Sequence, residues 1–279
     1  MSHADAGLQG GAIGAGATRL GRLADTRPGR TARDRLAVHG LLWPLVAARQ
    51  RPRRTGGREP TPGERVLAAL GFPGNIGERL VTRRTDVCIE GFPRSANTYT
   101  VLAFRQWNPG LRVAHHMHAV FQVRRAVKLG VPCCVLVREP LDAVASTVLM
   151  DRERVSDDAC FESYVRFHRG LEPLRNGVVV CDFEELVADP SVAVERLNER
   201  FGTAFASVPM TRADEASTLA EVRRRRRPAA GLPDYLTPAP SPEKERRKAE
   251  LRERLARHPA RAAAESAYAA LLPDRAAPR

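Results

Sequence analysis

Lysine is nearly absent from this chain of 279 residues, in which 45 basic residues stand against 32 acidic ones. The only lysines are Lys128, Lys244 and Lys248, so almost every basic residue is an arginine. Part of this skew reflects a genome rich in arginine and alanine codons, which reduces its value as a functional signal. The net charge of +13 still favours anionic partners such as nucleotides, nucleic acids, acidic lipids or acidic glycans.

Long apolar runs, paired-cysteine motifs and aromatic residues are scarce as well. No stretch approaches the roughly 18 apolar residues of a membrane-spanning helix, and residues 1–40 lack the compact apolar run of a signal peptide. The 5 cysteines form no Cys-x-x-Cys motif, and most lie in apolar runs typical of core strands. The sequence therefore predicts a cytoplasmic protein with reduced thiols. Aromatic residues make up 5% of the chain, too few for the stacking platforms of RNA-binding proteins.

The chain divides by composition near residue 60. Residues 1–60 are rich in Gly, Ala, Arg and Pro, and we expect a basic, low-complexity extension that is mostly helical or disordered. Residues 36–48 are apolar and fit a short helix on the domain or a segment on a membrane surface, and Pro44 favours the first. Residues 61–279 are expected to form one α/β domain, with its core at 86–202 and a basic loop and helices at 203–279.

Beyond residue 86, short apolar runs alternate with amphipathic segments. They predict strands at 87–89, 111–115, 131–137 and 177–181, and helices at 119–129, 141–150, 157–174, 191–201 and 243–257, with a last one ending at 272. Such alternation implies a parallel β-sheet flanked by helices. Ligands of these sheets bind at the carboxyl ends of the strands, where Arg94, His116, Arg138 and Asp182 are expected.

A phosphate-binding loop is the first motif at this edge. A buried strand ends at Gly91 and Pro93, and a run of small and capping residues then opens a helix: Arg94, Ser95, Ala96, Asn97 and Thr98. A helix N-terminus presents several backbone N–H groups that suit an anion, and Arg94 adds a fixed charge. The loop lacks the Gly-Lys-Ser/Thr end of the nucleoside-triphosphatase motif.

A second anion-binding pattern follows the third predicted strand. Arg138 ends that strand, Pro140 suits the first turn of a helix, and Ser146 lies eight residues beyond Arg138. Asp142 and Ser146 would be i,i+4 neighbours on one helix face.

Both motifs resemble those of the PAPS-dependent sulfotransferases. Residues 93–99 are similar to the 5′-phosphosulfate loop of that family, with Ala96 in place of its usual glycine, and Arg138 with Ser146 resembles its 3′-phosphate pair. The resemblance implies a P-loop-type sulfotransferase fold, PAPS as cofactor with PAP as product, and a small-molecule, lipid or glycan acceptor. It implies these nucleotide-binding residues: Arg94, Ser95, Ala96, Asn97, Thr98, Tyr99, Arg138, Ser146, Phe183, Arg226 and Arg227.

Four of these assignments depend on the family most directly. Tyr99 stands where the family has an aromatic ring that stacks on adenine, and Phe183 where it often has a tyrosine near the adenine. Arg226 and Arg227 end a run of arginines that resembles a basic loop closing on the 3′-phosphate, although such runs are also common on solvated surfaces.

Histidines after the second predicted strand are the candidates for a general base, as the resemblance to the cytosolic enzymes of the family implies. In an extended segment His116 and His118 share one face and His115 points away, so His118 and His116 are the expected catalytic residues, beside Arg94. Adjacent histidines on opposite faces argue against a zinc site, and no metal is expected. If no histidine is the base, Glu90 or Asp151 is the next candidate.

A different class of function remains open at this point. The charge and the arginine run also fit a basic protein that binds nucleic acid or acidic surfaces on a degenerate P-loop fold. The paired motifs favour the enzyme, for which no nucleic-acid partner is expected.

Overall fold

A four-stranded parallel sheet forms the centre of the computed structural model, which describes residues 79–150, 155–208, 211–225 and 241–272. The strand order is β2-β1-β3-β4. The strands are β1 (Val87–Gly91), β2 (Val113–His115), β3 (Cys133–Val137) and β4 (Val179–Asp182). Their apolar runs are buried on both faces, as expected for parallel strands, and the predicted α/β class is confirmed.

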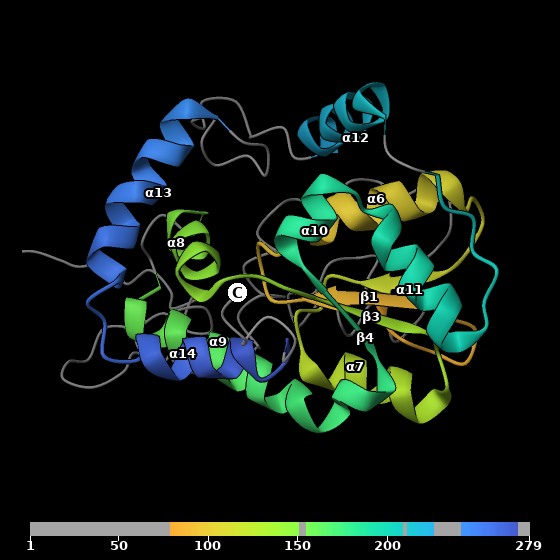
Figure 1. Ribbon diagram of the computed structural model, residues 1–279, viewed down its shortest axis with the longest axis horizontal. Coiled ribbons are helices and arrows are strands. Elements are labelled where there is room, and N and C mark those ends of the chain that lie inside the picture. The colour runs from red at the N-terminus through yellow and green to blue at the C-terminus, as the bar shows by residue number, and fades with distance from the viewer. Residues whose placement is uncertain (1–78, 151–154, 209–210, 226–240, 273–279) are drawn as a thin grey trace, which may run out of the picture.

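Helices cover both faces of this sheet (Figure 1). Alternate residues of β3 point to opposite faces, so Cys134 and Leu136 pack with α6 (Asn97–Trp107) and α11 (Ser191–Phe201). Cys133, Val135 and Val137 pack with α7 (Val120–Leu129) and α9 (Asp157–Leu171) on the other face. The two core clusters make a three-layer α/β/α arrangement.

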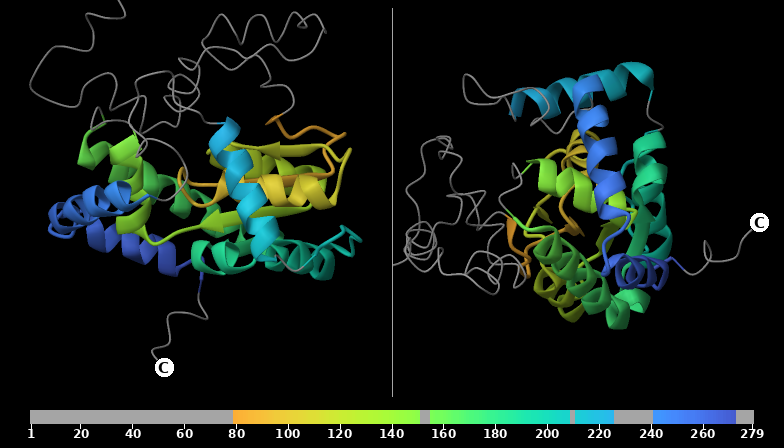
Figure 2. Two further views of the ribbon diagram at one scale, coloured as in Figure 1. Left: turned by 90° about the horizontal axis from the view of Figure 1, so that it is seen from above. Right: turned by 90° about the vertical axis from the view of Figure 1, so that its left-hand side faces the viewer.

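A second group of helices lies beyond the carboxyl ends of the strands. It comprises α8 (Pro140–Met150), α13 (Pro242–Leu255) and α14 (Arg261–Ala269). Figures 1 and 2 show α13 alongside α8, at the same end of the sheet as the loop after β1. This group therefore brings C-terminal residues to the edge where the sequence predicts a site.

Several element boundaries differ from the predictions. The helix α9 ends at Leu171 and is followed by a 3-10 helix, η1 (Glu172–Gly177), in place of the predicted helical end, because Pro173 at its second position cannot continue the α-helical hydrogen bonds. The short α10 (Phe183–Ala188) begins directly after β4 with Asp182 as its cap. Helix α12 (Arg212–Arg225) was not predicted, and it packs on α6 through the buried Thr218 and Val222.

All five cysteines of the chain are buried and none forms a disulfide. The closest pair is Cys134 and Cys181 on neighbouring strands, with 3.7 Å between their Sγ atoms. Among the helices that the structure describes, none is long and apolar enough to cross a bilayer. The predictions for residues 1–60, Asp151, Arg226 and Arg227 lie outside the described residues.

Candidate functional site

The loop from Phe92 to Ala96 connects β1 to α6 at the carboxyl edge of the sheet. Gly91 is needed at its start, because a Cβ there would lie 2.4 Å from the Leu136 carbonyl oxygen of the adjacent strand. The Asn97 side chain closes the loop by donating from Nδ2 to the Phe92 carbonyl oxygen at 2.9 Å. The Ser95 hydroxyl is buried and has no hydrogen-bond partner among the described residues. A buried orphan hydroxyl beside a helix N-terminus fits an anionic ligand.

The loop contains two non-glycine residues in the left-handed region. Arg94 has a φ of 72° and Ala96, the N-cap of α6, has a φ of 62°. A side chain with a Cβ is strained there by about 1–2 kcal/mol. Ala96 also supplies no side-chain cap, so the first amides of α6 point into the site without one.

Replacement of Ala96 by glycine is expected to stabilise the protein. The gain from relieving the strain is reduced by the greater entropy of glycine in the unfolded chain, leaving up to about 1 kcal/mol. That corresponds to a rise in Tm of about 2–4 °C, measured by thermal unfolding. Ala249→Gly on the exposed face of α13 is the matched control and should lower Tm. A lower Tm for Ala96→Gly would contradict the strain argument.

Arg138 directly follows β3 and contacts the loop between β1 and α6. Its Nη1 donates to the Arg94 carbonyl oxygen at 2.9 Å, and its Nη2 lies 3.3 Å from Asp142 Oδ2. The guanidinium stacks on the Phe183 ring, 3.7 Å from its centroid. The side chain is buried, and this burial lowers the pKa of Arg138 while the Asp142 charge opposes the shift.

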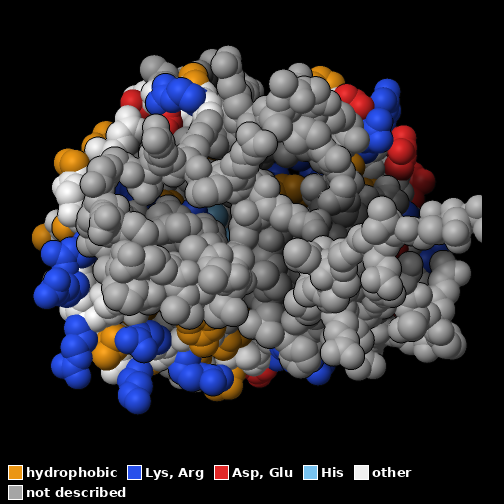
Figure 3. Space-filling view, turned by 180° about the vertical axis from the view of Figure 1, so that it is seen from behind, with side chains coloured by type: hydrophobic (Ala, Val, Ile, Leu, Met, Phe, Trp, Pro, Cys, Tyr) orange, Lys and Arg blue, Asp and Glu red, His pale blue; other side chains and the backbone are white. Residues whose placement is uncertain are grey.

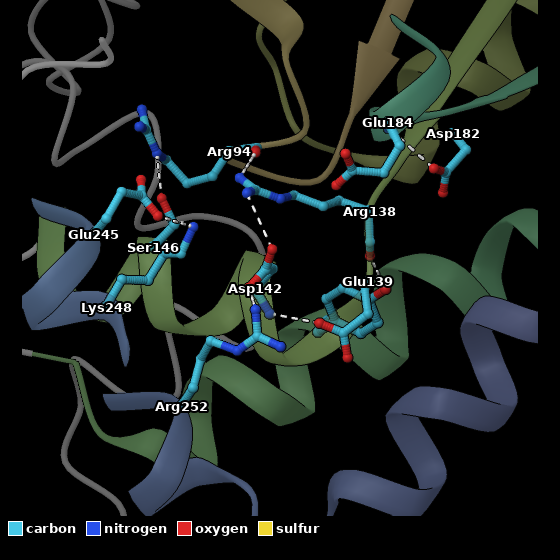
Figure 4. Close-up of polar contacts among 11 residues, drawn as sticks. Arg94, Arg138, Glu139, Asp142, Ser146, Asp182, Glu184, Glu245, Lys248 and Arg252 are labelled. Carbon is cyan, nitrogen blue, oxygen red and sulfur yellow. Dashed lines mark hydrogen bonds and ion pairs between the residues drawn. The ribbon is translucent and has the colours of Figure 1, made fainter. Parts of the chain in front are cut away.

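Ser146 belongs to the same group and lies one turn after Asp142 in α8. Arg94 Nε donates to Ser146 Oγ at 3.0 Å, so the two sequence motifs meet directly (Figure 4). The eight residues between Arg138 and Ser146 are spanned by the end of β3 and the first turns of α8. The sequence prediction that Arg94, Arg138 and Ser146 share one site agrees with this geometry.

The two aromatic residues of the predicted site occupy different positions. Phe183 begins α10 and is half-buried beneath the Arg138 guanidinium. Tyr99 lies in the first turn of α6 and is buried. Thr98, one residue earlier, contacts His116 through its hydroxyl.

The histidine segment is not extended as predicted. The strand β2 ends at His115, and the chain then turns with φ of 59° at His116 and 52° at His118. His115 does not point away, because its Nδ1 lies 2.6 Å from His116 Nδ1. The prediction of alternating faces is therefore wrong here, since two left-handed residues interrupt the extended backbone.

Hydrogen bonds distinguish His116 from His118. His116 Nε2 lies 2.9 Å from Thr98 Oγ1, so both of its ring nitrogens have partners in the site. His118 Nδ1 lies 2.7 Å from the Gly91 carbonyl oxygen, which can only accept. His118 Nδ1 must therefore carry the proton, and in the neutral ring Nε2 is the basic nitrogen.

The helix α13 supplies site residues that the sequence motifs do not reveal. Lys244 is buried, and burial together with the charge of Arg94 lowers its pKa to about 7. Figure 4 shows Glu245 and Lys248 beside Ser146, with 2.8 Å between Lys248 Nζ and Glu245 Oε2. Two of the three lysines of the chain thus face this edge, and their rarity was the sequence signal that could have identified them.

Asp142 links α13 to the same group. Its Oδ1 accepts a hydrogen bond from Arg252 of α13, while Oδ2 pairs with Arg138 (Figure 4). Tyr164 of α9 fixes the other side of Arg138 by donating to its carbonyl oxygen at 2.5 Å. Within the described parts of the chain, no group of three His, Cys, Asp or Glu residues could hold a metal ion.

Comparison with known proteins gives only remote likenesses, all among solved structures. No family model matches the chain, and no curated protein sequence does. Among solved structures, the chain is similar to a mouse sulfotransferase complexed with PAP, at 14% identity and a TM-score of 0.36, over 69% of this chain and 92% of the mouse chain. At this distance the likeness carries no argument about activity, and the function has to be inferred from the residues of the site.

Proposed function

We propose that the protein is a cytoplasmic sulfotransferase that moves a sulfuryl group from PAPS to a hydroxyl or amine of an acceptor. The observation that carries this proposal is the meeting of Arg94, Arg138 and Ser146 in front of the α6 N-terminus. Two guanidinium groups and an uncapped helix end fit a ligand with several negative charges. The resemblance of both motifs to those of the sulfotransferase family indicates that this ligand is PAPS.

The residues present fit the two ends of PAPS. The amides of residues 95–98 and Arg94 would hold the 5′-phosphosulfate, and Arg138 with Ser146 would hold the 3′-phosphate. The buried Ser95 hydroxyl would find its partner in the ligand. Phe183, which stacks on the Arg138 guanidinium, and Tyr99, which follows the loop in α6, would contact the adenine, as the resemblance to the family implies.

The chemical step follows from the charges on these side chains. PAPS would supply the activated sulfuryl group, whose bond to the bridging phosphate oxygen breaks as the acceptor oxygen or nitrogen bonds to sulfur. Arg94 and the loop amides would stabilise the negative charge that remains on the phosphate side. A basic side chain must take the acceptor proton.

His118 is our candidate for this base. Its neutral tautomer places the lone pair on Nε2, because Nδ1 donates to the Gly91 carbonyl oxygen. His116 is instead tied to the loop by Thr98 and would help to position it. Of the two histidines predicted from the sequence, the geometry therefore favours His118.

The decisive test is incubation of the protein with PAPS and a library of hydroxylated metabolites, lipids and glycans. Transfer appears as a mass gain of one SO₃ in the acceptor together with formation of PAP. The proposal fails if the protein neither binds adenosine 3′,5′-bisphosphate nor produces PAP with any acceptor.

The alternative, a protein that binds acidic surfaces, is favoured by the net charge of +13 and by the basic side chains along the lower left edge in Figure 3. Retention on immobilised adenosine 3′,5′-bisphosphate discriminates between the two. An enzyme should be eluted by that nucleotide and not by ATP, whereas a surface binder should be eluted by salt alone.

Lys244→Met tests the part of the site contributed by α13. Loss of a charge-assisted contact should weaken binding of adenosine 3′,5′-bisphosphate about tenfold or more, measured by calorimetry. Stability should not fall, because the folded protein holds the Lys244 proton less tightly than the unfolded chain does. Lys128→Met on the exposed face of α7 is the control. Unchanged affinity in Lys244→Met would exclude this residue from the site.

A further inference from the structure

A buried carboxylate on strand β1 contacts the segment that carries the histidines. Glu90 is the fourth residue of β1 and is 0% exposed, although its neighbours along the strand are the apolar Ile89 and the close-packed Gly91. A charged side chain in the central strand of a parallel sheet is costly unless its oxygens accept hydrogen bonds. The buried position of Glu90 therefore requires hydrogen-bond donors for its carboxylate oxygens.

Both oxygens of Glu90 accept hydrogen bonds from the turn that follows β2. Oε1 accepts from the Met117 amide at 2.7 Å, and Oε2 accepts from the His118 amide at 2.9 Å. The adjacent Gly91 carbonyl oxygen accepts from the His118 ring. The last two residues of β1 thus hold both the backbone and the imidazole of His118.

The turn itself is strained. His116 and His118 are both left-handed, and each such residue costs about 1–3 kcal/mol, so the conformation persists only where its surroundings enforce it. Two charge-assisted hydrogen bonds to consecutive amides are the contacts best placed to enforce it. A shorter or neutral side chain at residue 90 would leave one or both amides without a carboxylate.

We infer that Glu90 is a positioning residue, whose carboxylate holds the 116–118 turn so that His118 Nε2 faces the acceptor. This inference rests on the sulfotransferase activity proposed above. Glu90 itself is too deeply buried, with both oxygens engaged, to take the acceptor proton. We therefore do not retain Glu90 as a candidate for the general base.

The hold on the turn depends on the charge of Glu90. Burial raises the pKa of Glu90 to about 7, against the opposing effects of the Met117, His118 and Gly91 amides and of Arg79. Protonation turns one oxygen into an O–H donor and removes the negative charge, so Glu90 becomes a weaker acceptor for the two backbone amides. The other titratable groups close to Glu90 are the Cys88 thiol on the same strand and the histidines of the turn.

Glu90→Gln with nitrogen-labelled histidine tests the inference. In the wild type the His118 ring should give the ¹⁵N signals of an Nδ1-protonated imidazole, and in Glu90→Gln this tautomer should be lost. Turnover should fall about tenfold to a hundredfold, as for a base displaced by about 1 Å, while affinity for adenosine 3′,5′-bisphosphate stays unchanged. The exposed Glu172→Gln should behave like wild type in all three measurements.

The acid side of the pH–rate profile gives a readout that a purely structural role would not move. Protonation of Glu90 should steepen the fall of the wild-type rate on the acid side, and Glu90→Gln should make that fall less steep. An unaltered slope together with unaltered His118 signals would overturn the inference.

A measurement on the wild type alone covers the case in which the variant does not fold. The Glu90 carboxyl carbon and the His118 amide proton should shift with one shared midpoint in an NMR pH titration. Independent midpoints would refute the coupling. Because these NMR signals need no substrate, they test Glu90 even if no sulfuryl transfer is found.

Discussion

Arg138→Ala is expected to reduce the affinity for adenosine 3′,5′-bisphosphate at least about a hundredfold. The variant loses a buried, charge-assisted contact to phosphate, for which losses of about 2–5 kcal/mol are usual. It also loses the hydrogen bond to the Arg94 carbonyl oxygen and the stacking on Phe183, so the loop and the adenine side of the site are affected together. Isothermal calorimetry measures the change directly.

Two comparisons make the Arg138 result specific. Ser146→Ala should cost only about 1–2 kcal/mol, because one hydrogen bond to a charged group is removed. Arg166→Ala, at an exposed ion pair with Glu162 on α9, should leave affinity unchanged. Thermal unfolding must accompany each measurement, since Arg138 also pairs with Asp142. Wild-type affinity in both Arg138→Ala and Ser146→Ala would place the nucleotide site elsewhere.

His118→Ala should lower turnover by about 10²–10⁴, the usual contribution of a general base, and leave nucleotide binding intact. The groups that we propose bind the phosphates lie on the loop, α8 and the end of β3, whereas His118 is held by the end of β1. Steady-state rates with PAPS and nucleotide calorimetry on the same preparation separate the two effects.

His116→Ala provides the internal comparison for the base. Its loss removes the contact to Thr98 and should change donor binding as well as rate, because Thr98 lies in the first turn of α6, where we propose that the 5′-phosphosulfate binds. His115→Ala should act mainly through stability, since His115 is buried at the end of β2. If His116→Ala, and not His118→Ala, abolishes turnover while nucleotide affinity is retained, our assignment of the base is wrong.

The parts of the site that could be predicted from the sequence are those fixed by local pattern. Short apolar runs placed the four strands, and the order of strands and helices placed Arg94 and Arg138 at the same edge. The spacing of Arg138 and Ser146 spans the end of β3 and the first turns of α8, whose geometry is standard. Ala96, which stands in place of the family's usual glycine, has the left-handed φ that glycine adopts most readily.

The parts that could not be predicted depend on packing between distant segments. Lys244 reaches Arg94 only because α13 returns to α8, and no local pattern encodes that return. The turn at His116 and His118 is held by hydrogen bonds to the Glu90 carboxylate. Glu90 and His118 are separated by 28 positions, so no local pattern reveals this contact. Helix α12 has a weakly periodic sequence and is defined by its contact with α6.

The buried thiols offer an experimental handle on α13. All five native cysteines are enclosed in the core, so a single cysteine introduced at the exposed Arg247 would be the one readily accessible target for a thiol-reactive fluorophore. No native cysteine would first have to be removed. A dye at this position reports, through its emission and anisotropy, whether the helix that carries Lys244 and Lys248 changes its surroundings when a nucleotide is added.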